Sequence, residues 1–121
     1  MEAGRDQEAI DQFTRLLIAE PKHFEAHVNL GVLLGRQGRA EELLVQFKAA
    51  LGIKPESAEA LNNCGLALVE LGRVAEAIPY YRKALQVLPG FQIAESNLER
   101  ALSLLERSGG ASMAPQVPVR R

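Results

Sequence analysis

Two histidines and one cysteine are the side chains of this sequence with the most obvious chemical potential. His23 and His27 lie four residues apart in "HFEAH", with Glu25 between them. On a helix, this spacing brings two imidazoles to one face, where they could share a metal ion. The zinc-protease order requires Glu directly after the first histidine, where this chain has Phe24, and no third ligand stands out. We therefore expect no metal site.

Cys64 is the only cysteine, so it cannot form an internal disulfide or a zinc site built from thiolates alone. The sequence also has no Ser/His/Asp or Cys/His arrangement, no phosphate-binding glycine loop and no convergent pair of carboxylates. These patterns predict that the chain is not an enzyme and needs no cofactor.

Composition narrows the possible partners. The chain has 121 residues, of which 47% are hydrophobic and 24% charged, as expected of one globular domain. With 14 Lys and Arg against 15 Asp and Glu, no basic excess exists to neutralise a phosphate backbone, so we expect no nucleic-acid partner. No apolar segment approaches the roughly 18 residues of a membrane span, and no secretory leader is evident. We expect a soluble, cytoplasmic protein without a membrane partner.

The elements that position these residues follow from an internal repeat with an offset of 34 residues. Segments 24–57 and 58–91 are identical at 11 positions, which is more than chance pairing gives. The recurring columns are Gly4, Gly38 and Gly72; Arg5, Arg39 and Arg73; Glu8, Glu42 and Glu76; Pro21, Pro55 and Pro89; and the aromatic column Phe13, Phe47 and Tyr81.

Each unit contains two stretches with apolar residues at helical spacing, separated by a short segment with glycine. Gly38 and Gly72 suit the tight turn between two helices, because glycine adopts left-handed backbone angles without steric cost. Pro55 and Pro89 end the units. The repeat therefore predicts hairpins of antiparallel helices.

The second full unit reads Leu61-x2-Cys64-Gly65-x2-Leu68, then Ala77-x3-Tyr81 and Pro89; the first reads His27-x2-Leu30-Gly31-x2-Leu34, then Leu43-x3-Phe47 and Pro55. This pattern resembles the tetratricopeptide repeat over about residues 4 to 107. The resemblance implies an all-α fold, a right-handed α-solenoid of about six helices.

In this solenoid we expect five segments. Residues 1–22 would hold the second helix of an incomplete repeat, centred on residues 6–18; 23–57 and 58–91 would be full repeats; 92–107 would be a capping helix; and 108–121 would be a disordered tail. Arg120 and Arg121 in the tail could dock on an acidic surface, although a solvated end is the simpler interpretation. Two full units predict marginal stability and suggest a fragment of a longer array.

Several unusual residues receive a packing role from the resemblance. Cys64 takes the place of Leu30 and is expected in the core, as is His27, while His23 is expected near a helix start. Gly65, like Gly31, would let the two helices of a hairpin approach closely. Pro79 should kink its helix, and the adjacent Tyr80 and Tyr81 are expected to pack. In the capping helix, the apolar face would comprise Ala94, Leu98, Ala101, Leu102 and Leu105.

The asparagine column Asn29, Asn63 and Asn97 is the strongest candidate site, because asparagine is unfavourable in helix interiors yet recurs in each first helix. The family places this column on the concave groove, where a carboxamide can pair with both backbone groups of an extended peptide. Such a row resembles the peptide-holding ladder of superhelical arrays, including the repeat region of O-linked N-acetylglucosamine transferases. The alternative is that each amide bonds to the adjacent repeat and registers the stack. The sequence leaves both open.

Other candidates lie on the same face and would have to supplement the amides. They are Asn62, Glu25, Glu59, Arg36 and Arg100, with the apolar Val28, Val32 and Leu66. Chaperone-binding members of the family hold a C-terminal carboxylate with a basic clamp. Glu25 and Glu59 stand where one of its cations would be expected, so we do not expect a chaperone-tail receptor.

The main functional hypothesis is a scaffold that binds an extended peptide or partner segment in a concave groove. One alternative is an accessory segment of a larger enzyme such as a glycosyltransferase. Another is a structural module that self-associates through its first, uncapped helix.

Overall fold

The computed structural model describes residues 2–109, which form six α-helices and no strand. They are α1 (Glu2–Ala19), α2 (Phe24–Arg36), α3 (Ala40–Ile53), α4 (Ala58–Glu70), α5 (Val74–Val87) and α6 (Gln92–Arg107). The prediction of six helices is confirmed, although α1 is longer than the expected 6–18. The tail from residue 110 onward, with Arg120 and Arg121, lies outside the described residues.

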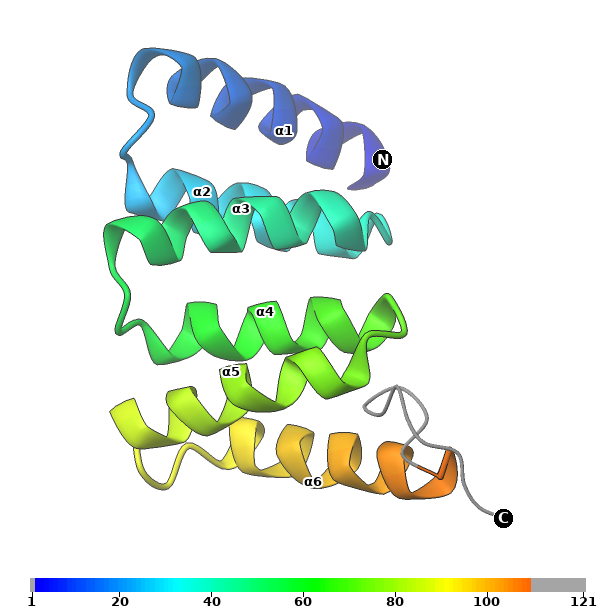
Figure 1. Ribbon diagram of the computed structural model, residues 1–121. Helices are drawn as coiled ribbons and strands as arrows, with labels where there is room; N and C mark the ends of the chain where they lie inside the picture. The colour runs from blue at the N-terminus through cyan, green and yellow to red at the C-terminus, as the bar shows by residue number, and fades with distance from the viewer. Residues whose placement is uncertain (1, 110–121) are drawn as a thin grey trace.

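The helices are stacked in chain order, so that α1 and α6 lie at opposite ends of the molecule (Figure 1). Each helix packs against its neighbours in sequence, and α4 also contacts α6. The stack has two layers: α1, α3 and α5 form the odd layer, and α2, α4 and α6 form the even layer. This arrangement confirms the predicted solenoid of helix hairpins.

The turns inside the two hairpins are built alike. Gly38 and Gly72 have φ angles of +71° and +77°, in the left-handed region that disfavours residues with a Cβ. The next N–H groups, of Arg39 and Arg73, donate to the carbonyl oxygens of Leu34 and Leu68 at 3.0 and 2.8 Å. These bonds help to satisfy carbonyl groups at the helix ends, where Leu34 also accepts from the Gln37 N–H at 3.1 Å.

A second recurring device begins the first helix of each full unit. His23 Nδ1 accepts a hydrogen bond from the Ala26 N–H at 3.1 Å, and Ser57 Oγ accepts one from the Ala60 N–H at 3.2 Å. Both are N-caps, which satisfy a backbone donor at the helix start. His23 therefore has a structural role, as its place near a helix start predicted.

The core of each hairpin is an aromatic ring packed on a glycine. A Cβ at Gly31 would lie 2.6 Å from the Phe47 ring, and one at Gly65 would lie 2.5 Å from the Tyr81 ring. Both rings are fully buried, and Cys64 lies in the same core. The close approach outweighs the roughly 1 kcal/mol that glycine costs inside a helix.

Pro79 lies inside α5, as expected, and the helix runs from Val74 to Val87 with the buried Ile78 and Tyr81 close to the proline in sequence. The kink expected at Pro79 stays a prediction. One residue of α6 differs from its sequence-based expectation. Leu102, expected on the apolar face of α6, is 39% exposed, because the buried face of that helix is narrower than its sequence pattern suggested.

Candidate peptide-binding face

The outward side of the even layer carries a repeated stripe of side chains. Residues three and seven positions apart lie on one face of a helix. On α2 this stripe begins with the exposed Asn29 and Val32, and on α4 with the half-buried Asn63 and Leu66. Among the described residues, neither the Asn29 nor the Asn63 side chain forms a hydrogen bond. Two amides and two apolar groups are therefore accessible at equivalent repeat positions.

Asn97, the third member of the column, has a different environment. It is 8% exposed, and its Nδ2 donates to Oδ1 of Asn62, which is 4% exposed, at 2.9 Å. Residue 62 corresponds to Val28 in the preceding unit, so α2 has an apolar side chain at the position where α4 has an amide. The Asn97 amide thus bonds to the adjacent repeat, as expected if the asparagines register the stack. The three asparagines of the column are therefore not equivalent.

Of the four charged candidates, two take part in surface ion pairs and the other two are exposed at the surface. Glu25 lies 3.9 Å from Lys54 Nζ, and Arg36 Nη1 lies 3.3 Å from Asp6 Oδ1, so both take part in ion pairs on the surface. Lys54 also lies over the Phe24 ring, 4.5 Å from its centroid. Glu59 and Arg100 are exposed. The spacing of the repeat could not reveal Lys54, because it comes from the loop before α4.

His27 is held by two hydrogen bonds and is half-buried. One ring nitrogen bonds Gln46 Oε1 at 2.8 Å and the other bonds the carbonyl oxygen of Pro21 at 2.7 Å. These contacts join α2 to α3 and to the preceding loop. No group of three metal-ligating side chains occurs within residues 2–109.

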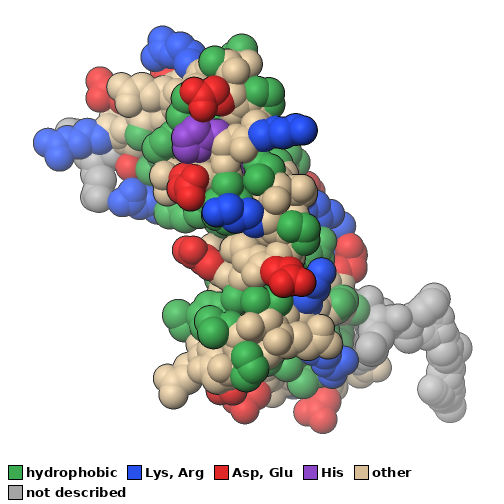
Figure 2. Space-filling model, turned by 90° about the vertical axis from the view of Figure 1, so that its left-hand side faces the viewer, with side chains coloured by type: hydrophobic (Ala, Val, Ile, Leu, Met, Phe, Trp, Pro, Cys, Tyr) green, Lys and Arg blue, Asp and Glu red, His purple; other side chains and the backbone are tan. Residues whose placement is uncertain are grey.

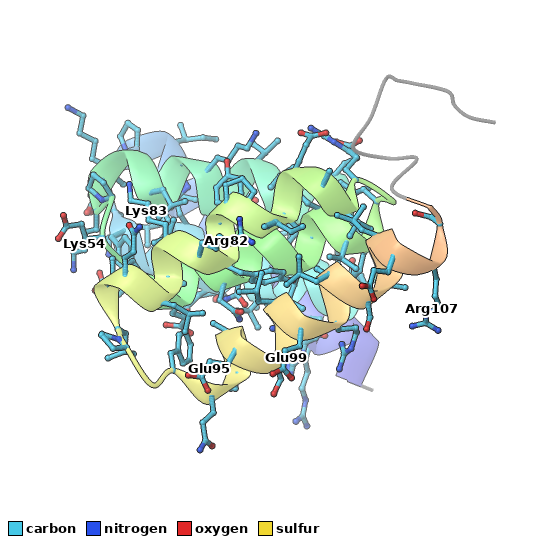
Figure 3. The ribbon with its side chains drawn as sticks, turned by 60° about the horizontal axis from the view of Figure 1, so that its bottom comes forward. Lys54, Arg82, Lys83, Glu95, Glu99 and Arg107 are labelled. Atoms are coloured by element: carbon cyan, nitrogen blue, oxygen red, sulfur yellow. The ribbon has the colours of Figure 1, made fainter. Side chains whose placement is uncertain are left out.

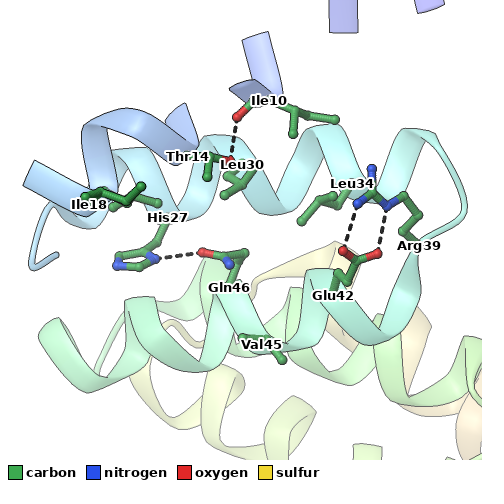
Figure 4. Close-up of a pocket in the computed structure, with 11 residues that line it drawn as sticks. Ile10, Thr14, Ile18, His27, Leu30, Leu34, Arg39, Glu42, Val45 and Gln46 are labelled. Carbon is green, nitrogen blue, oxygen red and sulfur yellow. Dashed lines mark hydrogen bonds and ion pairs between the residues drawn. The ribbon is translucent and has the colours of Figure 1, made fainter. Parts of the chain in front are cut away.

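Within residues 2–109, a pair of grooves on the odd layer occupies equivalent repeat positions. The first groove lies between α1 and α3 over α2 and has a volume of about 500 Å³. Its residues include Thr14, Ile18, His27, Val45 and Gln46, and the bond between His27 and Gln46 spans it (Figure 4). The second groove lies between α3 and α5 over α4, with a volume of about 410 Å³. No sequence motif indicated either groove.

Charged side chains of both signs are interspersed with apolar ones over the face drawn in Figure 2. No continuous basic or acidic field covers this face, in keeping with the formal net charge of −1. Long-range electrostatic steering towards this side of the molecule is therefore expected to be weak.

Helix hairpins with an aromatic ring on a helix glycine, stacked into a solenoid, define a helical repeat protein. Tetratricopeptide repeat models match residues 1–42 and 58–91. The chain therefore belongs to the tetratricopeptide repeat family, as the sequence predicted.

Several solved structures are similar to this chain. The first TPR of Spaghetti (RPAP3), bound to the HSP90 peptide SRMEEVD, has a TM-score of 0.81 at 22% identity, over 87% of this chain and 83% of that one. The Sgt2 TPR domain from Aspergillus fumigatus has a TM-score of 0.81 at 20% identity, over 99% and 81%. A point mutant of MamA has 31% identity over 64% and 57%, with a TM-score of 0.62. No curated protein sequence matches the chain.

Within residues 2–109, no helix combines the length and apolar character needed to cross a membrane.

Proposed function

We propose that this chain is a non-catalytic protein-interaction module that binds an extended peptide or partner segment along the outward stripe of the even layer. The observation that carries the proposal is the accessibility of Asn29 and Asn63 at equivalent positions, each followed one turn later by an apolar side chain, Val32 or Leu66. An amide offers a donor and an acceptor to the backbone of an extended peptide. The apolar groups offer area to bury.

Magnitudes indicate what else such a partner needs. Two amides with two hydrogen bonds each contribute about 4 kcal/mol net, which corresponds to a Kd of about 1 mM. Val32, which is 44% exposed, can add to this by burying its remaining surface. We therefore expect moderate affinity that depends on apolar side chains in the partner as well as on its backbone.

The charges around the stripe suggest an orientation for the bound segment. Glu25 and Glu59 lie in the first turns of α2 and α4, whereas Arg36 lies in the last turn of α2. Arg100 lies farther along α6 than Asn97. A segment with basic residues towards the helix starts and acidic residues towards the arginines fits this pattern. In this proposal Asn62 and Asn97 act indirectly, by fixing α6 against α4.

Peptides selected from a random phage-displayed library against the folded protein provide the test. For the selected peptides, we expect the variant Asn29→Ala/Asn63→Ala to weaken binding at least about tenfold, since about four hydrogen bonds are lost. Circular dichroism verifies the fold of the variant. Gln12→Ala/Gln86→Ala, which removes two exposed amides of the odd layer outside both grooves, is the matched control and should retain affinity. Equal affinity of the double variant and the wild type would overturn the proposal.

A further inference from the structure

The second groove differs from the first in chemistry, although both occupy the same position in the repeat. Six residues of the first groove correspond to six of the second at an offset of 34: Thr14 to Lys48, Leu17 to Leu51, Ile18 to Gly52, His27 to Leu61, Val45 to Pro79 and Gln46 to Tyr80. The common geometry makes the first groove an internal reference for the second.

The replacements make the floor of the second groove apolar. Leu61 stands where His27 bonds Gln46 in the first groove, and Tyr80 stands in place of Gln46, so the polar bridge is absent from this pair of positions. Gly52 replaces Ile18 and leaves open space, because a Cβ built there has no neighbour within 4 Å. The ring of Pro79 adds an apolar wall. Such a slot accepts apolar side chains.

The rim of the second groove is cationic. Lys48 on α3 and Lys83 on α5 line it and are exposed, whereas the first groove has Thr14 at the position of Lys48. Neither lysine forms an ion pair within residues 2–109. The Glu76 carboxylate accepts from Arg73 through both oxygens at 2.9 and 2.8 Å, and its pKa is lowered first by Arg73 and last by the charge of Lys48. Both ammonium groups are therefore available to a partner.

The labelled charges in Figure 3 agree with an anionic partner near Lys83. Lys54, which pairs with Glu25 at 3.9 Å, lies on the same side as Lys83, while Glu95 and Glu99 extend from α6 away from the other helices. The cation at the rim of the first groove, in contrast, is already in an ion pair, because Arg39 donates to both oxygens of Glu42 at 2.7 Å. Of the two grooves, the second alone combines unpaired cations with an open apolar slot.

We infer that the second groove is an additional docking site, on the face opposite the proposed peptide stripe, for an acidic segment of a partner protein that inserts one or two apolar side chains between α3 and α5. Glutamate or aspartate residues of that segment pair with Lys48 and Lys83, and its apolar side chains lie against Leu61 and Tyr80. A slot of about 410 Å³ suits side chains more than a membrane surface.

The test uses a fluorescein-labelled peptide of glutamates around a central Leu-Phe pair, with the full chain and fluorescence polarisation as readout. Two control peptides replace either Leu-Phe by Ser-Ser or the glutamates by lysines. We expect saturable binding of the first peptide only, and amide shifts in the NMR spectrum at Gly52, Tyr80 and Lys83 but not at Asn29 and Asn63. Shifts confined to the asparagines would overturn the inference while leaving the proposed function intact.

Variants separate the apolar and charged contributions. Gly52→Leu fills the slot with a better helix former and should weaken binding by about tenfold or more while retaining the melting temperature. The double variant Lys48→Glu/Lys83→Glu should bind the acidic peptide about tenfold more weakly than the wild type does. It should also gain affinity for the lysine peptide. Arg82→Glu/Arg107→Glu, with the same change in net charge outside the groove, should have little effect.

Two further outcomes count against this site. Unchanged affinity after both groove variants would overturn it, as would the absence of saturable binding at millimolar peptide. Binding to phosphatidylserine vesicles without binding to the acidic peptide would assign the lysines to a membrane surface instead.

Discussion

Asn97 Nδ2 donates to Asn62 Oδ1 at 2.9 Å across the interface between α4 and α6, and both side chains are buried. The bond joins consecutive even helices at a position where the preceding unit has Val28. A buried amide that loses its partner keeps the full cost of its desolvation. The pair therefore couples the last helix to the rest of the stack.

Breaking this pair from either side should destabilise the fold. We expect Asn97→Ala and Asn62→Ala each to lower the free energy of unfolding by about 1–3 kcal/mol, because the remaining amide is left buried without its partner. The double change to alanine should cost less than the sum of the two single changes, since no unpaired amide remains. Urea unfolding of all four proteins measures the coupling, and additive losses would show that the two amides act independently.

Two helix glycines should respond to alanine in opposite directions. Gly65→Ala places a Cβ 2.5 Å from the Tyr81 ring and should destabilise the protein by about 1–3 kcal/mol despite better helix propensity. Gly52→Ala enters open space in α3 and should be neutral or stabilise by up to about 1 kcal/mol. Thermal melts of the two variants provide the comparison. A stable Gly65→Ala protein would mean that Tyr81 can move aside without cost.

The thiol of Cys64 should be unreactive in the folded protein. Burial raises its pKa to about 12, although the charge of Lys48 acts in the opposite direction. At pH 8 about one thiol in ten thousand would then be ionised, and the side chain has no access to solvent. A disulfide reagent should react slowly in buffer and rapidly in urea. Rapid labelling of the folded chain at full stoichiometry would contradict the core assignment.

Alkaline pH should destabilise the fold through two buried acids. Burial raises the pKa of Cys64 from 9.0 and that of Tyr81 from 10.0, in both cases to about 12. Between these values the unfolded chain loses protons that the folded chain retains, so stability falls as pH rises, by up to about 1.4 kcal/mol per pH unit and group. Cys64→Ala and Tyr81→Phe should each flatten this slope between pH 9 and 12. Slopes equal to that of the wild type would show that other groups govern the decline.

The HSP90 peptide SRMEEVD, bound by the first TPR of Spaghetti, should not bind the even layer of this chain. Glu25 and Glu59 are exposed at the starts of α2 and α4, where they would repel the acidic residues and the terminal carboxylate. Titration by calorimetry of the Lys48→Glu/Lys83→Glu variant, in which the second groove no longer attracts acidic segments, should show a Kd weaker than about 1 mM, with the Spaghetti domain as positive control. Submicromolar binding would show that other cations of this chain replace the family's basic clamp.

The sequence by itself determined the features that depend on neighbours within one hairpin. The offset of 34 residues placed Gly38 and Gly72 in turns with positive φ, and it aligned Gly31 with Phe47 as it aligned Gly65 with Tyr81. Helix spacing and backbone sterics fix these contacts locally, so the pattern of residues suffices to predict them. It predicted helix ends less well, because α1 begins at Glu2.

Only the tertiary structure decided which candidates are accessible. Asn29, Asn63 and Asn97 are identical in the repeat, yet Asn97 is buried against Asn62 while Asn29 is exposed. Equivalent positions face different neighbours in successive units, and burial depends on those neighbours. The two grooves differ in chemistry for the same reason. Lys48 contributes to a cationic rim only because Lys83, on another helix, lines the same groove. Contacts between units thus determine the candidate sites, whereas contacts within units determine the fold.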